Sequence, residues 1–441
     1  MLRTKNTARH RRYHVKDERG IVIVLVAVMM LFVVGAMAAL SIDVVTLYTA
    51  RSEAQLAADA AALAGARVIA NSGATSDTTL ALLPLAEPIA RAVAIQVAMQ
   101  NQVGGANLTA PQVTPSFGGS FTDPTITVQV QVPGLPAFFS RIWGNKQFTV
   151  SASATAEAYN PSGTTVGGQI PVAPFCVKPW LVPNMDPSNA GKPIFDPTTG
   201  AITSGSNLLG WSSTSTGGVA MSPACNGVNG SCIPMPSLPL TQWTYFPGDD
   251  ATTFPPPPTP SCSTALTTPY QFSIAGCIQI PISCSSPVGN PAKIDPNPYP
   301  GSGRSSDTTD AVNCLTHATA SGGGDTVTPP VPLTAPFQFI AGDGNPLVAA
   351  GALTTGANTP VSDSLVTVPV FDVNSYNSGA GTAAIIGFVQ LFLNPNGAQT
   401  LPLGSVNTTV INLAGCGSAV AGTAINGNGA SPVAVRLITP P

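Results

Sequence analysis

The most apolar run of the chain lies near its N-terminus, at residues 21–42, and none of these 22 residues is charged. An α-helix rises about 1.5 Å per residue, so a helix of that length covers roughly 33 Å and can cross a bilayer core of roughly 30 Å. The helical pattern continues without a proline through Asp43 into an alanine-rich stretch that ends near Ala66. The sequence therefore predicts one long helix, half in lipid and half in water.

Apolar residues recur at three- and four-residue spacing in residues 88–102 and predict a second helix, which Gly104 and Gly105 end. Its apolar face consists of Ile89, Ala90, Val93, Ala94, Val97 and Ala98. We expect this helix to pack antiparallel on residues 50–66.

Strict alternation of apolar and polar residues then predicts two strands, at residues 125–132 and 148–158. The first strand places Ile126, Val128, Val130 and Val132 on one face. A short helix is predicted between the strands, at residues 136–143. Two helices, a strand, a short helix and a strand make a small α+β module, which is similar to pilin-like architecture.

The remaining chain divides by composition. Residues 160–168 are typical of a linker, residues 169–325 are rich in proline and cysteine, and residues 285–325 are polar without periodicity, which predicts a long loop. Residues 326–441 are predicted to be mainly β, with strands at 364–371, 384–393, 408–413 and 433–438. We expect the last strand to close this domain. The predicted fold class is α+β. Further boundaries between segments are predicted after residues 20, 42 and 159.

Charge is scarce and unevenly placed. Only 8% of the 441 residues are charged, and the 43 glycines and 44 prolines favour a secreted, loop-rich β protein. Seven of the 17 basic residues but two of the 20 acidic residues lie in residues 1–20. Basic flanks stay in the cytoplasm, so we expect a cytoplasmic N-terminus and an extracytoplasmic remainder. A nucleic-acid-binding arm is the alternative for residues 1–20, but the acidic remainder argues against nucleic acid as a partner.

The apolar run has a second interpretation, as a cleaved secretory signal. Residues 36–38, Ala-Met-Ala, have the small-x-small form of a cleavage site. The apolar region of a signal is shorter, however, and residues 40–47 remain largely apolar beyond that site. We therefore favour a retained anchor.

All eight cysteines lie beyond the apolar run, at Cys176, Cys225, Cys232, Cys262, Cys277, Cys284, Cys314 and Cys416. An even number outside the membrane predicts up to four disulfides in an oxidising compartment. The sequence leaves the pairing open. Pairs Cys225–Cys232 and Cys277–Cys284 would close short loops.

A specific motif runs from the start of the apolar span into the alanine-rich helix. It consists of Arg19, Gly20, Asp43, Tyr48, Arg51, Gln55, Ala58, Asp59, Ala61, Ala62, Leu63 and Gly65. This stretch resembles the TadG-like proteins, with their TadE/TadG-like N-terminal region, of the Flp (tight-adherence) pilus-assembly system of bacteria. The resemblance is strong over roughly the first seventy residues and weaker to about Tyr159.

The resemblance implies a single-pass protein of the bacterial inner membrane that takes part in assembling or anchoring Flp-type pili. Its implied partners are membrane lipid and pilin-like or Tad secretion-platform proteins. Prepilin peptidase cuts after a glycine such as Gly20 and usually requires a glutamate five residues on, where this chain has Leu25. We therefore expect no cleavage there.

The alanine-rich half of the long helix allows two arrangements. Small side chains at three- and four-residue spacing let a helix approach closely, either the chain's own second helix or a partner, self-association included. Arg51, Gln55 and Asp59 lie at four-residue steps on one face. They can hydrogen-bond along the helix or reach a partner.

Candidate catalytic groups are few. His317 is the one histidine beyond the membrane span, and no Gly-x-Ser-x-Gly elbow accompanies it. The cysteines have no Cys-x-x-Cys spacing, which argues against zinc. We expect no enzyme activity and no cofactor.

Two acidic clusters, Asp307 with Asp310 and residues 343–345, have oxygen chemistry suited to calcium, but turn formation explains them equally well. Residues 186–190 begin the Asp-x-Ser-x-Ser metal motif of the von Willebrand A-type domain that many longer TadG-like proteins carry, and depart from it at Ala190. We assign no metal site and no such domain.

The favoured function is a non-catalytic scaffold or anchor in Flp-type pilus assembly. The alternative is a surface adhesin or glycan-binding module displayed on a membrane anchor. A secreted hydrolase that uses His317 is the least favoured.

Overall fold

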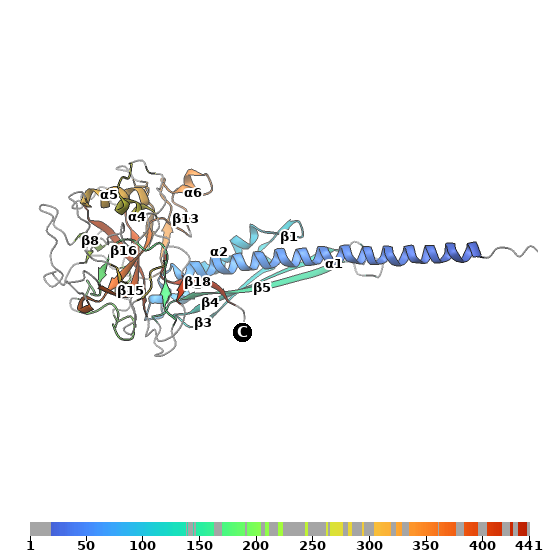
Figure 1. Cartoon of the computed structure of the whole chain (residues 1–441), viewed down its shortest axis with the longest axis horizontal. Helices are drawn as coiled ribbons and strands as arrows, with labels where there is room; N and C mark the ends of the chain where they lie inside the picture. The colour runs from blue at the N-terminus through green and yellow to red at the C-terminus, as the bar shows by residue number, and fades with distance from the viewer. Residues whose placement is uncertain are drawn as a thin grey trace, which may run out of the picture.

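The structure is a computed structural model with a globular head at one end of a single projecting helix (Figure 1). It describes residues 19–137, 139, 144, 147–162, 170–189, 192–203, 208–210, 219–223, 243–245, 262, 265–276, 281–284, 293–294, 304–318, 323–328, 335–359, 361–375, 383–395, 404–416, 424–426 and 431–438.

Helix α1 (Arg19–Ala70) is continuous over 52 residues and is therefore about 78 Å long. Most side chains of its first half are exposed, whereas one face of its second half is buried by the rest of the chain. The prediction of one long helix is confirmed.

Helix α2 (Leu83–Met99) packs against the second half of α1. It begins five residues before the predicted start, because Pro84 rather than Pro88 is the proline of its first turn. The face in contact is also narrower than predicted. Ala86, Ala90, Ala94 and Ala98 are fully buried, while the valines and the isoleucine of the predicted face are only partly buried.

The two helices cover a four-stranded antiparallel sheet of order β18-β5-β4-β3. Its strands are β3 (Val113–Gly119), β4 (Pro124–Pro136), β5 (Gln147–Tyr159) and β18 (Ala434–Ile438). The alternation in β4 is as predicted, with Ile126, Val128 and Val130 fully buried. Pro136, the predicted start of a short helix, instead ends β4, and most of residues 137–143 lie outside the described residues.

Strand β18 corrects the expectation that the last strand closes the C-terminal domain. It pairs antiparallel with β5, where Arg436 lies opposite Glu157. The Arg436 guanidinium forms an ion pair with Glu157 and lies over the Tyr159 ring at 5.9 Å. Strand β18 covers the edge of β5, which would otherwise expose unpaired backbone groups.

The head contains a larger sheet of order β7-β14-β15-β16-β8-β9, with β10 paired to β15. Every residue of strands β14 and β16 is buried, and in β16 these include the polar residues Asn407, Thr408, Thr409 and Asn412. The strands are β7 (Val182–Pro183), β8 (Val219–Pro223), β9 (Thr244–Tyr245), β10 (Lys293–Ile294), β14 (Leu365–Phe371), β15 (Ala383–Leu393) and β16 (Val406–Gly415).

Smaller elements complete the described chain. They are the hairpin β1 (Gln102–Val103) and β2 (Ala106–Asn107), the pair β6 (Val172–Ala173) and β17 (Ile425–Asn426), the sheet β11 (Thr326–Thr328), β12 (Gln338–Ile340) and β13 (Asn358–Thr359), the helices α4 (Pro269–Ala275), α5 (Arg304–Leu315) and α6 (Pro346–Ala349), and the 3-10 turns η1 (Ala74–Ser76), η2 (Ala110–Gln112) and η6 (Val373–Ser375).

Helix α5 corrects the prediction of a long loop over residues 285–325. Its few buried residues, Thr308, Ala311 and Val312, make a face too short and too polar to produce a clear apolar periodicity. Helix α4 did have a local signal: Thr268 caps it, Pro269 occupies its first turn and Gln271 completes a capping box.

Buried amides join the end of α1 to the large sheet. The Asn412 side chain on β16 donates to Ala70 O at 2.6 Å and to the Gln390 side chain at 2.6 Å. Gln390 in turn donates to the side chain of Asn71 at 3.2 Å. A carbonyl at a helix end needs a partner when it is buried, and here β16 supplies it. The head is therefore fixed to the last turn of α1.

Candidate interaction surface on the long helix

The alanine face of α1 lies inside the protein. Ala54, Ala57, Ala58, Ala61 and Ala62 are fully buried and pack with α2, β4 and β5. The sequence allowed these alanines to pack either on the chain's own second helix or on a partner, and in the structure they pack within the chain. Self-association through these alanines would require the module to open.

Gly65 shows why the motif contains a glycine there. A Cβ atom at this position would lie 2.5 Å from Ile126 Cδ1 and 3.4 Å from the Ala94 Cβ atom. The α1 backbone thus touches both α2 and β4 at this point. Leu63, two residues earlier, is partly buried against the same core. By contrast, Gly20 has no atom within 4 Å of such a Cβ.

Asp43 lies at the end of the module that is nearest the projecting half of α1. Its side chain is 3% exposed, and its two carboxylate oxygens accept from the Phe139 N–H at 3.3 and 3.1 Å. Phe139 follows the end of β4, and the β4–β5 hairpin runs along α1 toward the projecting half of the helix (Figure 1). The motif aspartate therefore holds this end of the hairpin against the helix.

The polar motif residues divide between internal and exposed roles. The Gln55 side chain donates to Asp59 at 2.7 Å and to Ser153 O on β5 at 3.1 Å, so it links α1 to the sheet. Tyr48 and Arg51 are exposed, the tyrosine by 77%. Leu56 is 66% exposed on the same helix.

Tyr48, Ser52 and Leu56 lie at four-residue steps on one side of α1 and are all exposed. We name these three residues the outer strip. They are the exposed counterpart of the alanine face.

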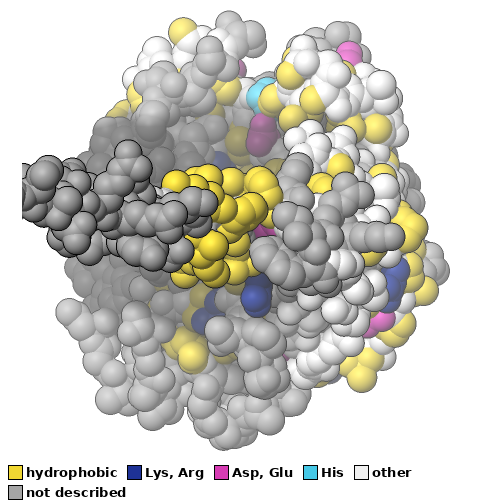
Figure 2. All heavy atoms as spheres, turned by 90° about the vertical axis from the view of Figure 1, so that its right-hand side faces the viewer, with side chains coloured by type: hydrophobic (Ala, Val, Ile, Leu, Met, Phe, Trp, Pro, Cys, Tyr) yellow, Lys and Arg dark blue, Asp and Glu magenta, His cyan; other side chains and the backbone are white. Residues whose placement is uncertain are grey.

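Two grooves flank α1 near Asp43. The larger, of about 600 Å³, lies between α1, the β1–β2 turn and the end of β4. The smaller, of about 440 Å³, lies between α1 and the start of β5 and includes Tyr48 and Arg51. Figure 2 views the molecule from the end of the projecting helix, and the hydrophobic side chains at the centre of this view are those of the exposed first half of α1, which points toward the viewer.

The disulfides connect distant parts of the head. Cys284 pairs with Cys416 and Cys262 pairs with Cys314. The predicted short loop between Cys277 and Cys284 is therefore wrong, because Cys284 bonds across the core to the end of β16. Cys176 is also disulfide-bonded. Cys225, Cys232 and Cys277 lie outside the described residues.

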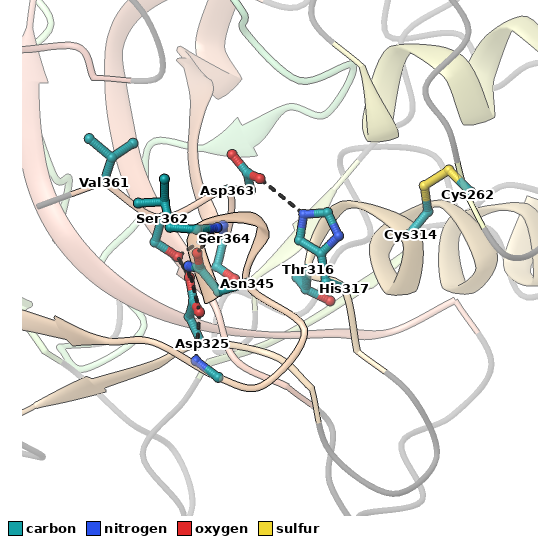
Figure 3. A network of polar contacts seen from close by, with 12 residues as sticks. Cys262, Cys314, Thr316, His317, Asp325, Asn345, Val361, Ser362, Asp363 and Ser364 are labelled. Carbon is teal, nitrogen blue, oxygen red and sulfur yellow. Dashed lines mark hydrogen bonds and ion pairs between the residues drawn. A yellow bond between two sulfur atoms is a disulfide. The ribbon is translucent and has the colours of Figure 1, made fainter. Parts of the chain in front are cut away.

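His317 lies beside a carboxylate (Figure 3). Its Nε2 atom is 2.9 Å from Asp363 Oδ2, and this hydrogen bond raises the pKa of the imidazole. The adjacent Ser362 hydroxyl donates to Asp325 at 2.5 Å rather than to His317. Asp325 is buried and also accepts from the Asn345 side chain. The described contacts thus form a structural network rather than a serine–histidine pair.

The acidic clusters considered for calcium form local hydrogen bonds. Asp307 accepts from the Gln271 side chain at 3.2 Å, and Asn345 caps α6. The Asp186 carboxylate accepts from the N–H and hydroxyl of Ser188. No group of three or more histidine, cysteine, aspartate or glutamate side chains within metal-binding reach occurs among the described residues.

Lys178 is a buried cation that the sequence did not reveal. Its Nζ atom donates to Ile274 O and Gly276 O, both at 2.6 Å, at the end of α4. Burial lowers the pKa of this lysine to about 7. Its two hydrogen bonds place it at the C-terminal end of α4.

These features define a class: a protein whose described residues include one helix long and apolar enough to cross a membrane, joined to an α+β module and a disulfide-containing head. Only 6% of the most apolar part of that helix is buried, unlike the core helix of a soluble protein. Residues 20–68 match the family described as "Putative Flp pilus-assembly TadE/G-like". No curated protein and no solved structure matches the chain.

The family match confirms the predicted TadE/TadG-like N-terminal region and supports a membrane-anchored, single-pass protein involved in Flp pilus assembly. It covers α1 from Gly20 almost to its end. The match therefore includes both the alanine face and the outer strip.

Proposed function

We propose that this protein is a non-catalytic component of Flp-type pilus assembly that acts as a scaffold. Its N-terminus is cytoplasmic, α1 crosses the inner membrane, and the module and head are extracytoplasmic. The observation that carries the proposal is the division of one family-matching helix into a buried alanine face and an exposed outer strip. The buried face builds the module, so the outer strip is left for partners.

The outer strip suits a helical partner. Tyr48 and Leu56 expose large apolar surfaces, and the small Ser52 between them allows close approach. Leu56 lies 13 residues beyond Asp43, which places it about 20 Å above the membrane boundary. A pilin-like protein with a similarly projecting helix would meet the strip at that level.

The test is photo-crosslinking in living cells with the full chain. A photoreactive residue is placed at Ser52 or Leu56, and the captured proteins are identified by mass spectrometry. The matched control is Ala58, which is on the same helix but fully buried. We expect Ser52 and Leu56 to capture pilin-like or secretion-platform proteins, and Ala58 to give only products within the chain.

The opposite pattern would refute the proposed surface. If Ala58 captured the partner and Ser52 and Leu56 did not, the module would open during assembly and the alanine face would be the contact. Pilus assembly that survives both Tyr48→Asp and Leu56→Asp, with the protein present at normal levels, would also contradict the role of the strip.

The proposal contains no catalytic step for His317. We expect His317→Ala to leave pilus assembly unchanged, because its contact with Asp363 is a surface ion pair of small energetic weight. Loss of pilus assembly in a folded His317→Ala protein would favour the hydrolase alternative.

A further inference from the structure

The larger groove beside α1 has walls from three parts of the module. One wall is α1, the second is the β1–β2 turn at Gly104 and Gly105, and the third is the end of β4 at Leu135 and Pro136. The turn touches β4, because a Cβ at Gly104 would lie 2.5 Å from Leu135 Cδ2. The volume of about 600 Å³ lies within the range of about 300–1,000 Å³ that is usual for small-molecule sites.

The lower end of this groove lies at the membrane surface. If the hydrocarbon core covers residues 21–42, headgroups occupy about 5–7 Å beyond it, or roughly four residues of helix. The groove-lining residues Asp43, Val45 and Thr46 lie at that level, next to Ile42 at the edge of the hydrocarbon core. Ile42 and Val45 are 52% and 64% exposed, so the groove continues the apolar surface of the membrane span.

The groove changes character along its length. Its end nearest the membrane span is lined by Ile42, Val45 and Leu47 and by Asp43, whose carboxylate accepts from the Phe139 N–H, whereas its other end carries Glu53, about 15 Å beyond Asp43 along the helix. Glu53 Oε2 accepts from the Gly104 N–H at 2.7 Å, which fixes the carboxylate at the groove wall. An apolar channel with a fixed negative group at the far end fits a molecule with an apolar chain and a cationic head.

We propose that this groove binds one phospholipid drawn partly out of the surrounding leaflet, with its acyl chain along Ile42, Val45 and Leu135 and its primary ammonium headgroup at Glu53, about 8–10 Å beyond the headgroup layer. The inference rests on the membrane anchoring included in the proposed function. A phospholipid is favoured over a second protein because the groove opens onto the bilayer. The carboxylate selects ethanolamine headgroups over anionic ones.

The test uses the full-length protein in nanodiscs that contain phosphatidylethanolamine and phosphatidylglycerol in equal amounts. A trace of either lipid carries a photoactivatable group in its acyl chain, and labelled peptides are identified by mass spectrometry. We expect labelling of the peptides that contain Gly105 and Leu135. The ethanolamine probe should label them at least fivefold more than the glycerol probe.

Two variants and a matched control sharpen the test. Thr46→Trp fills the groove from α1, and we expect it to reduce labelling near Leu135 at least fivefold. Val44→Trp adds the same side chain at an exposed position of the helix outside this groove and should leave labelling unchanged. Glu53→Gln retains an acceptor for Gly104 and should remove the preference for ethanolamine. Thermal melting confirms that each variant is folded, and Thr49→Phe replaces Thr46→Trp if that variant is not.

Labelling of residues 22–40 serves as an internal reference. If those residues are labelled and the groove is not, or if Thr46→Trp and Thr49→Phe do not reduce groove labelling, the lipid site is refuted while the anchor stands. If residues 22–40 are not labelled either, the membrane anchoring fails and the lipid site fails with it. Chain-to-chain crosslinks from the groove in place of lipid labelling would identify a second copy as the occupant and overturn the proposal.

Discussion

The N-terminal module and the C-terminal head are stabilised in different ways. The module depends on small residues: the alanines of α1 and α2 and Gly65 let two helices and a sheet approach closely. The head depends on large buried side chains such as Trp180, Phe388 and Phe392, and on covalent bonds between distant segments. Small-residue packing produces a recognisable motif over a short stretch, whereas the head's contacts are spread over more than two hundred residues.

The module and the head differ in what stabilises them, and we expect the largest effect on stability from removal of the Cys284–Cys416 disulfide in the head. Replacing both cysteines with serine opens a link across 132 residues and should lower the free energy of unfolding of the head by about 3–5 kcal/mol. Removing Cys262–Cys314, which spans 52 residues, should cost about 0.8 kcal/mol less by loop entropy. Denaturant unfolding measures both. Equal loss of stability in the module would show that module and head unfold as one unit.

The second effect addresses the module. Gly65→Leu forces side-chain atoms into Ile126 and α2, and we expect a loss of about 3 kcal/mol through overpacking. Gly35→Leu adds the same side chain where nothing lies within 4 Å and should leave stability unchanged. Limited proteolysis of α2 in the membrane-embedded protein gives the readout. Equal resistance of the two variants would mean that the close approach at Gly65 is not required.

The third effect tests the joint between the two regions. Asn412→Ala removes the donor to Ala70 O and leaves that buried carbonyl without its partner, at a cost of about 2 kcal/mol. Asn358→Ala, which removes an exposed hydrogen bond to Gln338, is the matched control and should have little effect. Hydrogen exchange at the last turn of α1 should rise only in the first variant.

The smallest effect is a pH dependence at Asp123, in the turn between β3 and β4. Burial and the neighbouring Glu157 carboxylate raise the pKa of Asp123 to about 6. Because the folded state then binds the proton more tightly than the unfolded state, stability falls as pH rises from about 4 through about 6. Asp123→Asn should flatten this part of the pH profile of melting temperature. A profile unchanged by the substitution would assign the dependence to another group.

The sequence predicted the module better than the head. The alternation in β4 and β5 and the continuous α1 pattern were sufficient, because each depends on near neighbours in the chain. The predicted boundaries remain predictions, although β18 crosses them by pairing with β5. Such a pairing depends on the edge of β5 and on the Arg436–Glu157 ion pair. The two residues of this ion pair are 279 positions apart in the chain. Periodicity contains no information at that range.

The motif residues fall on both sides of α1. Its alanines prove to be internal, whereas Tyr48 and Arg51 are exposed. Sequence spacing alone could not separate the two sides, because the face that packs depends on contacts with α2, β4 and β5. The disulfide Cys284–Cys416 could not be predicted, since eight cysteines allow 105 pairings.

The fixed joint at Ala70 has a mechanical consequence. From Asp43 to Ala70, α1 rises about 40 Å without a break, and its last turn is bonded to the head. A tilt of about 20°, which is usual for membrane helices, would shift the far end sideways by about 14 Å. A spanning helix that is longer than the hydrocarbon core can tilt to fit it, so the local thickness of the membrane contributes, together with packing against neighbouring helices, to where the head is presented.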